Sequence, residues 1–521
     1  MIQKFLLGLL FFCLASQANA SHLVGADMSY TSLGSGKFKI TLKVYRDCRG
    51  IPLGILSLNA FAGNNGGNNC GLVSIKAFSR VKISDITNIC AQSSMPCNPS
   101  NTSGSGTGIE EHIYERVVDF AILPLKNFVN NSSCCEVTFS ANECCRSGSI
   151  TTGSAGLDFY ITCSINLCNL KRTNKAENTS PQWVYKPVVK ACCNVPYYGA
   201  NDIGDTVDFD SITFSMFAPI QALPYLAVNY TSPFSSRYPL TPYCIPPTSI
   251  KCTPDPTLET PKGFYFDTVT GDFVFTPTKC DEVPVISFEQ KEWRKDTKTG
   301  EWLCIGRTHR EIQLWVNTNC ASNIPPRIFG ERKMSVCAGK KICHTITVLD
   351  KTVTPLQTLA DTPNIVWNAN FTGAVFKVVD SLQREKEVYF CWQTKLSDAA
   401  DVAYGFSITA NDSQCNPNLP SIANFKVKVI DCSKSEIKNV KSKVPSERII
   451  PNPSSGLFAI VLQKEISHTE VVVCDLAGRK IYAKIFNDSK ELLMDLQLPS
   501  GIYFANFEID NQLRSLKFVI E

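Results

Sequence analysis

Apolar and polar side chains alternate with a period of two in several separate stretches of the chain. Between residues 37 and 44, four apolar residues alternate with three lysines and one threonine. This pattern gives one buried and one solvent-facing side, as in a β-strand. Residues 212–216 and 406–410 alternate in the same way, and residues 264–277 hold two such runs around a Thr-Gly-Asp turn. No long helical periodicity follows the first 20 residues, so we predict an all-β fold.

A degenerate repeat follows residue 180. In each copy a proline precedes a cysteine by 11 residues, as Pro181 precedes Cys192 and Pro326 precedes Cys337. Each copy then ends in an alternating strand and one more cysteine. The first copy is longer because of a Pro-rich stretch near residues 230–262, which we interpret as a surface insertion. Short alternating strands in repeated units predict tandem Ig-like β-sandwiches.

A chain of 521 residues is too long for one domain. The pattern divides it into a leader, three β domains, a linker rich in Lys and Ser, and a small C-terminal β-sandwich. The predicted bounds are 1–20 for the leader, 21–179 for a Cys-rich β domain, 180–320 and 321–432 for the two repeat copies, 433–446 for the linker and 447–521 for the C-terminal module.

The N-terminus has the three parts of a secretory signal peptide. Lys4 precedes an apolar run over residues 5–14, and Ala18-Asn19-Ala20 supplies small residues for cleavage. We predict cleavage after Ala20, which makes Ser21 the first mature residue. No other apolar run is long enough to span a bilayer, so we expect no transmembrane segment in the mature chain.

Cysteine content supports an oxidising compartment. The chain has 24 cysteines, and 22 are left when Cys13 in the leader and Cys474 in the C-terminal module are set aside. An even set behind a signal peptide predicts disulfides. Three pairs are adjacent in sequence, at 134–135, 144–145 and 192–193. Neighbours on a strand point to opposite faces, so we expect each member to bridge a different partner. Metal binding is the alternative, but these pairs lack zinc-ribbon spacing.

Composition narrows the partner classes. The chain is 44% hydrophobic and 19% charged, which suffices for ordinary cores. Its net charge of +4 is spread along the chain, and no basic patch is interleaved with aromatic residues. We therefore expect no nucleic-acid partner.

The C-terminal module combines turn residues with β-formers. Pro451-Asn452-Pro453 and Gly456 open it, and a valine run precedes an Asp-Leu-Ala-Gly block that ends at Gly478. A Gly-Ile-Tyr-Phe block and a basic, apolar end follow. The residues singled out are Pro451, Asn452, Pro453, Gly456, Gly478, Gly501, Tyr503 and Lys517.

In this order, the four blocks resemble the type A C-terminal sorting domain of type IX secretion cargo in Bacteroidota. The resemblance implies export in two steps, by the signal peptide and then by the type IX machinery. It also implies a secreted protein, extracellular or on the outer-membrane surface, and relatives are cleaved near the start of this domain. The alternative is a last Ig-like domain that merely closes the array.

Blocks farther upstream carry a looser resemblance, over residues 21–432. Ser21-His22-Leu23-Val24-Gly25, Tyr45-Arg46-Asp47-Cys48, Cys144-Cys145-Arg146 and Asn178-Thr179-Ser180-Pro181 resemble gliding-motility and adhesin-type surface proteins. The hairpin at 264–277 is similar to cadherin-like and other Ig-like repeats. The implied function is binding or structural, in adhesion or gliding, toward a surface, glycan or protein ligand. A secreted hydrolase with the same tail and a spacer stalk are the alternatives.

Catalytic signals are missing from the sequence. The five histidines form no zinc-protease motif, and no nucleophile elbow is present. His344 follows Cys343, but a cysteine at a strand start favours a disulfide or core role over a nucleophile. We therefore predict a protein that is not an enzyme, and no cofactor apart from a candidate calcium site.

That candidate site is an acidic run. Asp202, Asp205, Asp208 and Asp210 cluster oxygen ligands near a turn, and such hard ligands suit Ca²⁺. The resemblance implies an Asp-x-Asp-Gly-Asp-Ser run here, as relatives often carry, whereas this chain has Asp208-Phe209-Asp210-Ser211, a run without glycine. Turn-forming aspartates at a domain edge are the alternative.

Overall fold

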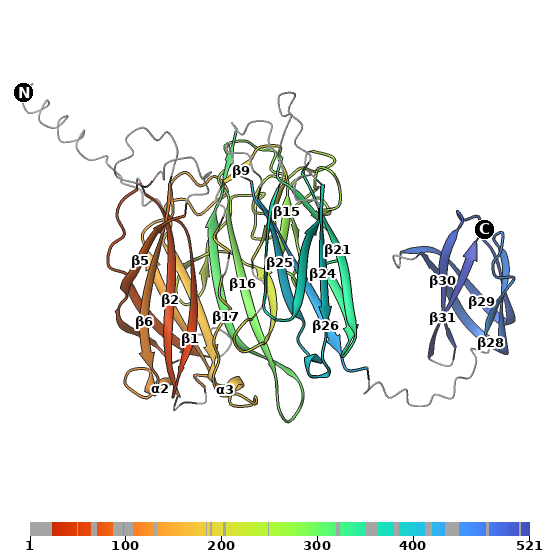
Figure 1. The fold of residues 1–521 in the computed structure, drawn as a ribbon, viewed down its shortest axis with the longest axis horizontal. Helices are drawn as coiled ribbons and strands as arrows, with labels where there is room; N and C mark the ends of the chain where they lie inside the picture. Colours follow the sequence, from red (N-terminus) through yellow and green to blue (C-terminus); the bar gives the residue numbers. More distant parts are fainter. Residues whose placement is uncertain are drawn as a thin grey trace, which may run out of the picture. The chain divides into compact units, whose positions relative to one another are not determined.

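The computed structural model describes residues 23–520, except 49, 64–69, 87–96, 98–107, 130, 132, 184, 188–189, 202–204, 248, 319–323, 351–362, 380–384, 412–418, 433–446, 476–478 and 510–511. The predicted cleavage site at Ala20 and Ser21 and the predicted linker lie outside these residues. The chain divides into two compact units, Met1–Asp431 and Cys432–Glu521, and each is described by itself (Figure 1).

The first unit is built on one 13-stranded sheet, which includes the strands predicted from alternation at residues 37–44 and 212–216. Its main path runs β4-β3-β7-β8-β17-β1-β2-β6-β5, with β16 and β11 continuing from β17, and β12 and β13 from β8. The strands are β1 Leu23–Gly34, β2 Lys37–Asp47, β3 Ser57–Gly63, β4 Leu72–Ala77, β5 Ser79–Asp85, β6 Ile109–Asp119, β7 Glu136–Glu143, β8 Phe159–Asn166, β11 Ser211–Met216, β12 Ile220–Ala222, β13 Leu226–Ala227, β16 Val285–Lys295 and β17 Trp302–Gln313.

Strand β2 shows how pattern becomes structure. Its apolar positions are buried and its lysines lie outside, in the alternation read from the sequence. The buried faces of β1, β2 and β6 share one core with those of β3, β7 and β8. Two four-residue helices, α2 Lys126–Val129 and α3 Leu167–Leu170, lie in the connections.

Smaller sheets add a second layer. Strands β10 Tyr197–Ala200, β15 Asp272–Phe275 and β14 Tyr265–Phe266 form an antiparallel sheet that includes the predicted hairpin, and β9 Lys190–Cys192 pairs in parallel with β18 Trp315–Asn317. A second apolar core joins this layer to β16 and β17. Because β17 pairs with β1 and β8 on the main sheet, the boundary predicted at 179/180 runs through a continuous sheet.

Residues 327–430 form a two-sheet sandwich around their own core. The sheets are β19-β21-β24-β23 and β20-β26-β25-β22, and β20 pairs with β26 in parallel. The bounds are β19 Arg327–Phe329, β20 Lys333–Cys337, β21 Lys341–Leu349, β22 Asn364–Ala369, β23 Ala374–Val379, β24 Glu385–Gln393, β25 Tyr404–Asn411 and β26 Ser421–Ile430, with a 3-10 helix η1 at Leu396–Asp398.

A polar joint links this sandwich to the layer that precedes it. The buried carboxylate of Asp272 accepts the N–H of Asn424 at 3.1 Å, and the Asn424 amide donates to the carbonyl of Thr270 at 2.8 Å. Burial is the main cause that raises the pKa of Asp272 to about 7, although Arg332 lies 4.0 Å away.

Disulfides cross-link the first unit, as predicted. Both members of the pair at 134–135 bridge to separate partners, Cys70 and Cys168. The same expectation is wrong for the pair at 144–145, whose members bond each other. These two residues lie just beyond the end of β7, where the chain turns and strand alternation no longer separates neighbours. Further bridges are Cys48–Cys97, Cys193–Cys280, Cys244–Cys252 and Cys343–Cys391.

The second unit is a five-stranded β module with a single apolar core. The strand order is β27-β28-β30-β31, and β29 also pairs with β28. The strands are β27 Arg448–Ile450, β28 Leu457–Asp475, β29 Lys480–Asp495, β30 Gly501–Ile509 and β31 Gln512–Ile520.

Candidate functional site

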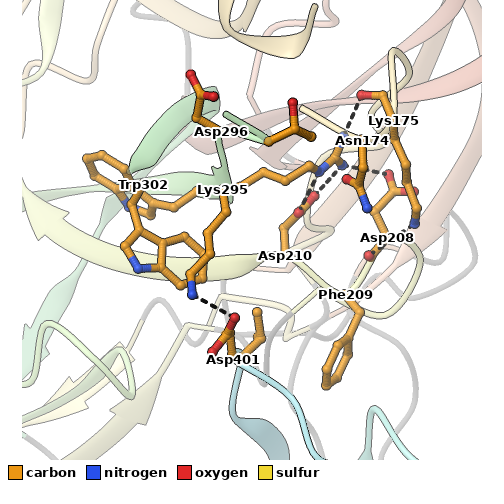
Figure 2. Close-up of a pocket in the computed structure, with 13 residues that line it drawn as sticks. Asn174, Lys175, Asp208, Phe209, Asp210, Lys295, Asp296, Trp302 and Asp401 are labelled. Atoms are coloured by element: carbon orange, nitrogen blue, oxygen red, sulfur yellow. Dashed lines mark hydrogen bonds and ion pairs between the residues drawn. The ribbon is translucent and has the colours of Figure 1, made fainter. Parts of the chain in front are cut away.

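A cavity of about 390 Å³ opens in the first unit beside the β16–β17 hairpin (Figure 2). The chain contributes to it from three distant segments, around residues 174–175, 208–210 and 401–402. Two tryptophans, Trp293 and Trp302, line the hairpin side. Basic and acidic side chains complete the wall, so the cavity combines flat apolar faces with charged groups.

Asp296 builds the turn of the hairpin. Its Oδ1 accepts the N–H groups of Lys298 and Thr299, at 2.7 and 3.1 Å, as short polar side chains do in tight turns. Arg172, from a separate segment, pairs with the other oxygen of Asp296 at 2.6 Å. The turn is thereby fixed, and β16 and β17 leave it in register, with Trp302 opposite Lys295.

Trp302 is partly exposed at the edge of the cavity. It is 41% exposed, and the Lys295 ammonium lies 5.3 Å from its ring centroid. Asp401, from the segment after η1, holds the same ammonium at 2.6 Å. Trp293 is oriented by a 2.8 Å bond from its Nε1 to Thr213 Oγ1. A flat apolar face bordered by polar groups can bind a sugar ring or a side chain of a protein ligand.

Arg294 organises the wall opposite these aromatic rings. It donates two bonds to Asp210, at 2.8 and 2.5 Å, and one to Asn178 Oδ1 at 2.8 Å. The carbonyls of Lys175 and Glu177 accept two more at 3.0 Å. All five N–H donors of the guanidinium are therefore satisfied, which fixes the position of this segment.

Behind Arg294 lies a fully buried carboxyl group. Glu292 accepts bonds from Asn178 and from the Tyr30 hydroxyl, at 2.7 and 3.0 Å. Burial, and then the nearby Asp205 and Asp210, raise the pKa of Glu292 well above its usual range. Gly306 on β17 leaves room for this contact, because a Cβ there would collide with both partners.

The Asn-Thr-Ser-Pro block at residues 178–181, one of the blocks of the looser resemblance, lies alongside β1. The Ser180 hydroxyl accepts the N–H of Tyr30 at 2.9 Å, and the Thr179 hydroxyl accepts that of Ser32 at 3.0 Å. The N–H of Ser180 donates back to the Tyr30 carbonyl at 3.0 Å. The block thus pairs with β1 and carries Asn178 to Glu292 and Arg294.

Three of the four predicted calcium ligands come together here. Carboxylate oxygens of Asp205, Asp208 and Asp210 lie within 4.8 Å of one another, and Asp202 lies outside the described residues. Asp205 accepts the N–H groups of residues 207, 208 and 210, and Arg294 pairs with both oxygens of Asp210. Burial raises the pKa of Asp205 and that of Asp210. The donors have the class that Ca²⁺ takes, but Arg294 already neutralises one of them, and calcium stays a prediction.

Sequence reasoning missed the tryptophan pair and the buried acid. One local signal was available, since Glu292 and Arg294 occupy positions on one face of a strand whose other face carries Trp293. Charged residues on both sides of an aromatic residue can mark a buried ion pair. The partners Tyr30 and Asn178 are more than 100 positions away, and no local pattern indicates them.

Other residues considered for chemistry have structural partners. Cys343 is bonded to Cys391, as the disulfide interpretation predicted, and His344 accepts the Glu331 N–H at 3.0 Å. A hydroxyl, imidazole and carboxylate do align at Thr162, His309 and Glu289, with contacts of 2.5 and 3.3 Å. Thr162 is fully buried, which leaves its hydroxyl unavailable to a substrate.

In the second unit, the opening motif residues join the two ends of the module. The Asn452 side chain accepts the N–H of Val519 at 2.9 Å and donates to the carbonyl of Lys517 at 3.1 Å. Gly456 has φ +113°, and a Cβ there would collide with the Leu496 carbonyl, so glycine is required. Pro451 and Pro453 are exposed on either side of Asn452.

The closing motif residues are less uniform. Tyr503 is buried, donates to the Pro499 carbonyl at 2.8 Å and packs on Phe518. Gly501 would accept a Cβ without a close contact, and Lys517 is exposed. Gly478 lies outside the described residues. The structure therefore assigns folding roles to Asn452, Gly456 and Tyr503.

The architecture defines an all-β, disulfide-containing protein whose last module folds as a separate β unit. Residues 448–521 match the family of secretion system C-terminal sorting domains. The protein is type IX secretion cargo, secreted to the cell surface or the extracellular space. The C-terminal module therefore addresses the chain to the type IX machinery.

Comparisons of the whole chain add no further assignment. No curated protein matches it. The chain is similar to titin domains A168–A170, with 10% identity and a TM-score of 0.15, over 63% of this chain and 99% of the titin chain. It is also similar to the protocadherin γB4 extracellular domain, with 10% identity and a TM-score of 0.16, over 88% of this chain and 63% of the protocadherin chain. Drosophila OTK extracellular domains 3–5 match with 8% identity and a TM-score of 0.14, over 66% of this chain and 98% of the OTK chain. In the described part of the chain, no helix has the length and apolar character needed to cross a bilayer.

Proposed function

We propose that this type IX cargo is a non-enzymatic surface protein of adhesion or gliding, and that the Trp302 cavity contacts its ligand. The observation that supports this proposal is the exposed indole of Trp302 beside a cavity of about 390 Å³. Large ligand-facing aromatic groups dominate binding energy at many interfaces, and their rings suit the apolar faces of sugars. A surface glycan is the ligand we favour.

Rigid surroundings support the same proposal. Arg294 fixes one wall through five bonds, and the turn at Asp296 fixes the other. A preformed site loses less conformational entropy on binding than a mobile one. The cavity also joins segments of the first unit that are distant in sequence, so ligand contact depends on the whole folded unit.

Binding of the purified mature chain to glycan and protein arrays tests the proposal. We expect a Trp302→Ala variant to lose at least tenfold in affinity for the best ligand. Trp367→Ala is the matched control, because Trp367 is 45% exposed on β22 and lies outside the cavity, and its binding should not change. Equal affinity of both variants would remove the cavity from the proposal.

The same assay separates the alternatives. A chain that binds nothing on either array supports a spacer stalk. Release of shortened glycans or peptides from the array supports the hydrolase alternative. Neither result affects the sorting assignment, which rests on residues 448–521.

A further inference from the structure

The bridge between Cys144 and Cys145 differs from the six other bridges given above. The other six join residues 8 to 87 positions apart, whereas this one joins neighbours. A disulfide stabilises a fold mainly by restricting the loop that it closes in the unfolded chain. A bridge between neighbours closes no such loop, so fold stability does not account for it.

The position of this pair suits chemistry at the surface. Cys144 is exposed and Cys145 half-buried, just after β7. The exposed carboxylate of Asp158 lies across the loop, with Oδ1 at 3.9 Å from Cys145 Sγ. Ligand atoms of the three side chains lie within 4.8 Å of one another. Two sulfur atoms and one oxygen atom of this kind can occupy three positions around a tetrahedral cation.

The next residue anchors the loop without help from the bridge. Arg146 is 2% exposed and makes two bonds to Glu311, at 2.6 and 2.7 Å. It also donates to the carbonyls of Asp158 and Ile220, and its N–H donates to the Leu157 carbonyl at 2.9 Å. Opening the bridge would therefore leave both sulfurs and Asp158 near their present positions.

We propose that Cys144 and Cys145 form a redox-active site whose reduced state binds a thiophilic divalent cation, with Asp158 as third ligand. A thiolate of a dithiol reductant attacks one sulfur, the bond between the cysteines breaks, and the other cysteine leaves as a thiolate. The second thiol of the reductant then displaces the first cysteine. Two electrons and two protons pass to the protein, and the reductant becomes a cyclic disulfide.

Graded reduction of the mature full chain with dithiothreitol tests the redox step. Free thiols are alkylated at each concentration and assigned by mass spectrometry. We expect Cys144 and Cys145 to react at a reductant concentration at least tenfold lower than Cys135 and Cys168, whose bridge closes a 33-residue separation. Alkylation of all four at the same concentration, or of the adjacent pair last, would overturn the proposal.

Titration of the selectively reduced chain with Cd²⁺ tests the binding step, through the ultraviolet charge-transfer absorption of Cd–thiolate bonds. We expect one Cd²⁺ per chain, loss of binding when both cysteines are changed to serine, and at least tenfold weaker binding in Asp158→Asn. Cys474→Ser, which removes a free thiol in the second unit, should bind normally. Unchanged binding in the double serine variant would contradict the site, and unchanged binding in Asp158→Asn would remove the third ligand.

Discussion

The two units of this chain stabilise their strands by different means. In the first unit, disulfides and buried ion pairs supplement the apolar cores, as at Arg146, Arg294 and Arg310, each paired with a buried carboxylate. In the second unit one apolar cluster fills the interior, and the buried polar side chains among its described residues are Ser454 and Thr469. From residue 448 to 520, the described residues include one cysteine, the free Cys474, and no buried charged side chain, whereas the first unit has both disulfides and buried ion pairs.

Complete reduction should separate the two units most strongly. Each bridge that closes a long loop contributes about 2–4 kcal/mol. Five of the bridges given above join residues 33 to 87 positions apart, so their loss removes about 10–20 kcal/mol, which matches or exceeds the roughly 5–15 kcal/mol by which domains are stable. All six tryptophans lie before residue 393, so their fluorescence reports the first unit alone. We expect that signal to unfold under reductant, while hydrogen exchange in residues 447–520 stays slow. Simultaneous loss of protection in both units would contradict the comparison.

Removal of a buried cation should come next in size. Arg294→Met leaves the carboxylate of Asp210 buried without its partner, which costs about 3–5 kcal/mol. Lys39→Met is the control, because the pair between Lys39 and Glu115 is about one-third exposed and should contribute under about 1 kcal/mol. Urea unfolding followed by tryptophan fluorescence measures both. Equal effects of the two variants would mean that Arg294 does not organise the wall.

The comparison also explains which features the sequence could reveal. The motif of the second unit could be predicted because Asn452, Gly456 and Tyr503 have the local sequence preferences of turns and strands. The strands of the first unit were readable for the same reason. Its sheet topology was not, because β17 lies between β8 and β1 only through long-range pairing. Part of the site could be predicted, because Asp205, Asp208 and Asp210 are close in sequence. The role of Trp302 could not be predicted, because no local pattern indicates it.

The stability of the first unit should depend on pH through the protonation of Asp272. Its pKa of about 7 in the folded state exceeds the ordinary value, so the folded chain holds this proton more tightly. The resulting stability is fully present below about pH 4 and is lost as the pH rises through 7, by about 4 kcal/mol. Asp272→Asn should remove that slope. Urea midpoints from pH 4.5 to 8 measure it, and parallel curves for the two proteins would contradict the raised pKa.

Two glycines of the sorting motif offer a matched pair in the second unit. Gly456→Ala introduces a Cβ at φ +113° against the Leu496 carbonyl and should cost about 2 kcal/mol, with reduced export. Gly501→Ala meets no close contact and should cost under about 0.5 kcal/mol. Hydrogen exchange of residues 447–520 and surface display measure both variants. Lost display of a stable Gly501→Ala protein would indicate recognition of that position by the machinery, not a folding role.

Calcium should have the smallest effect. Because Arg294 already pairs with Asp210, a cation at Asp205 and Asp208 competes with a satisfied network, and we expect a dissociation constant near the millimolar range. At about 1 mM Ca²⁺, linkage then gives under about 1 kcal/mol of added stability. Melting curves with calcium and with a chelator measure this shift, and Asp208→Asn should abolish it. Identical curves for the native chain would end the calcium hypothesis, and the aspartates would then act as turn and ion-pair residues of the first unit.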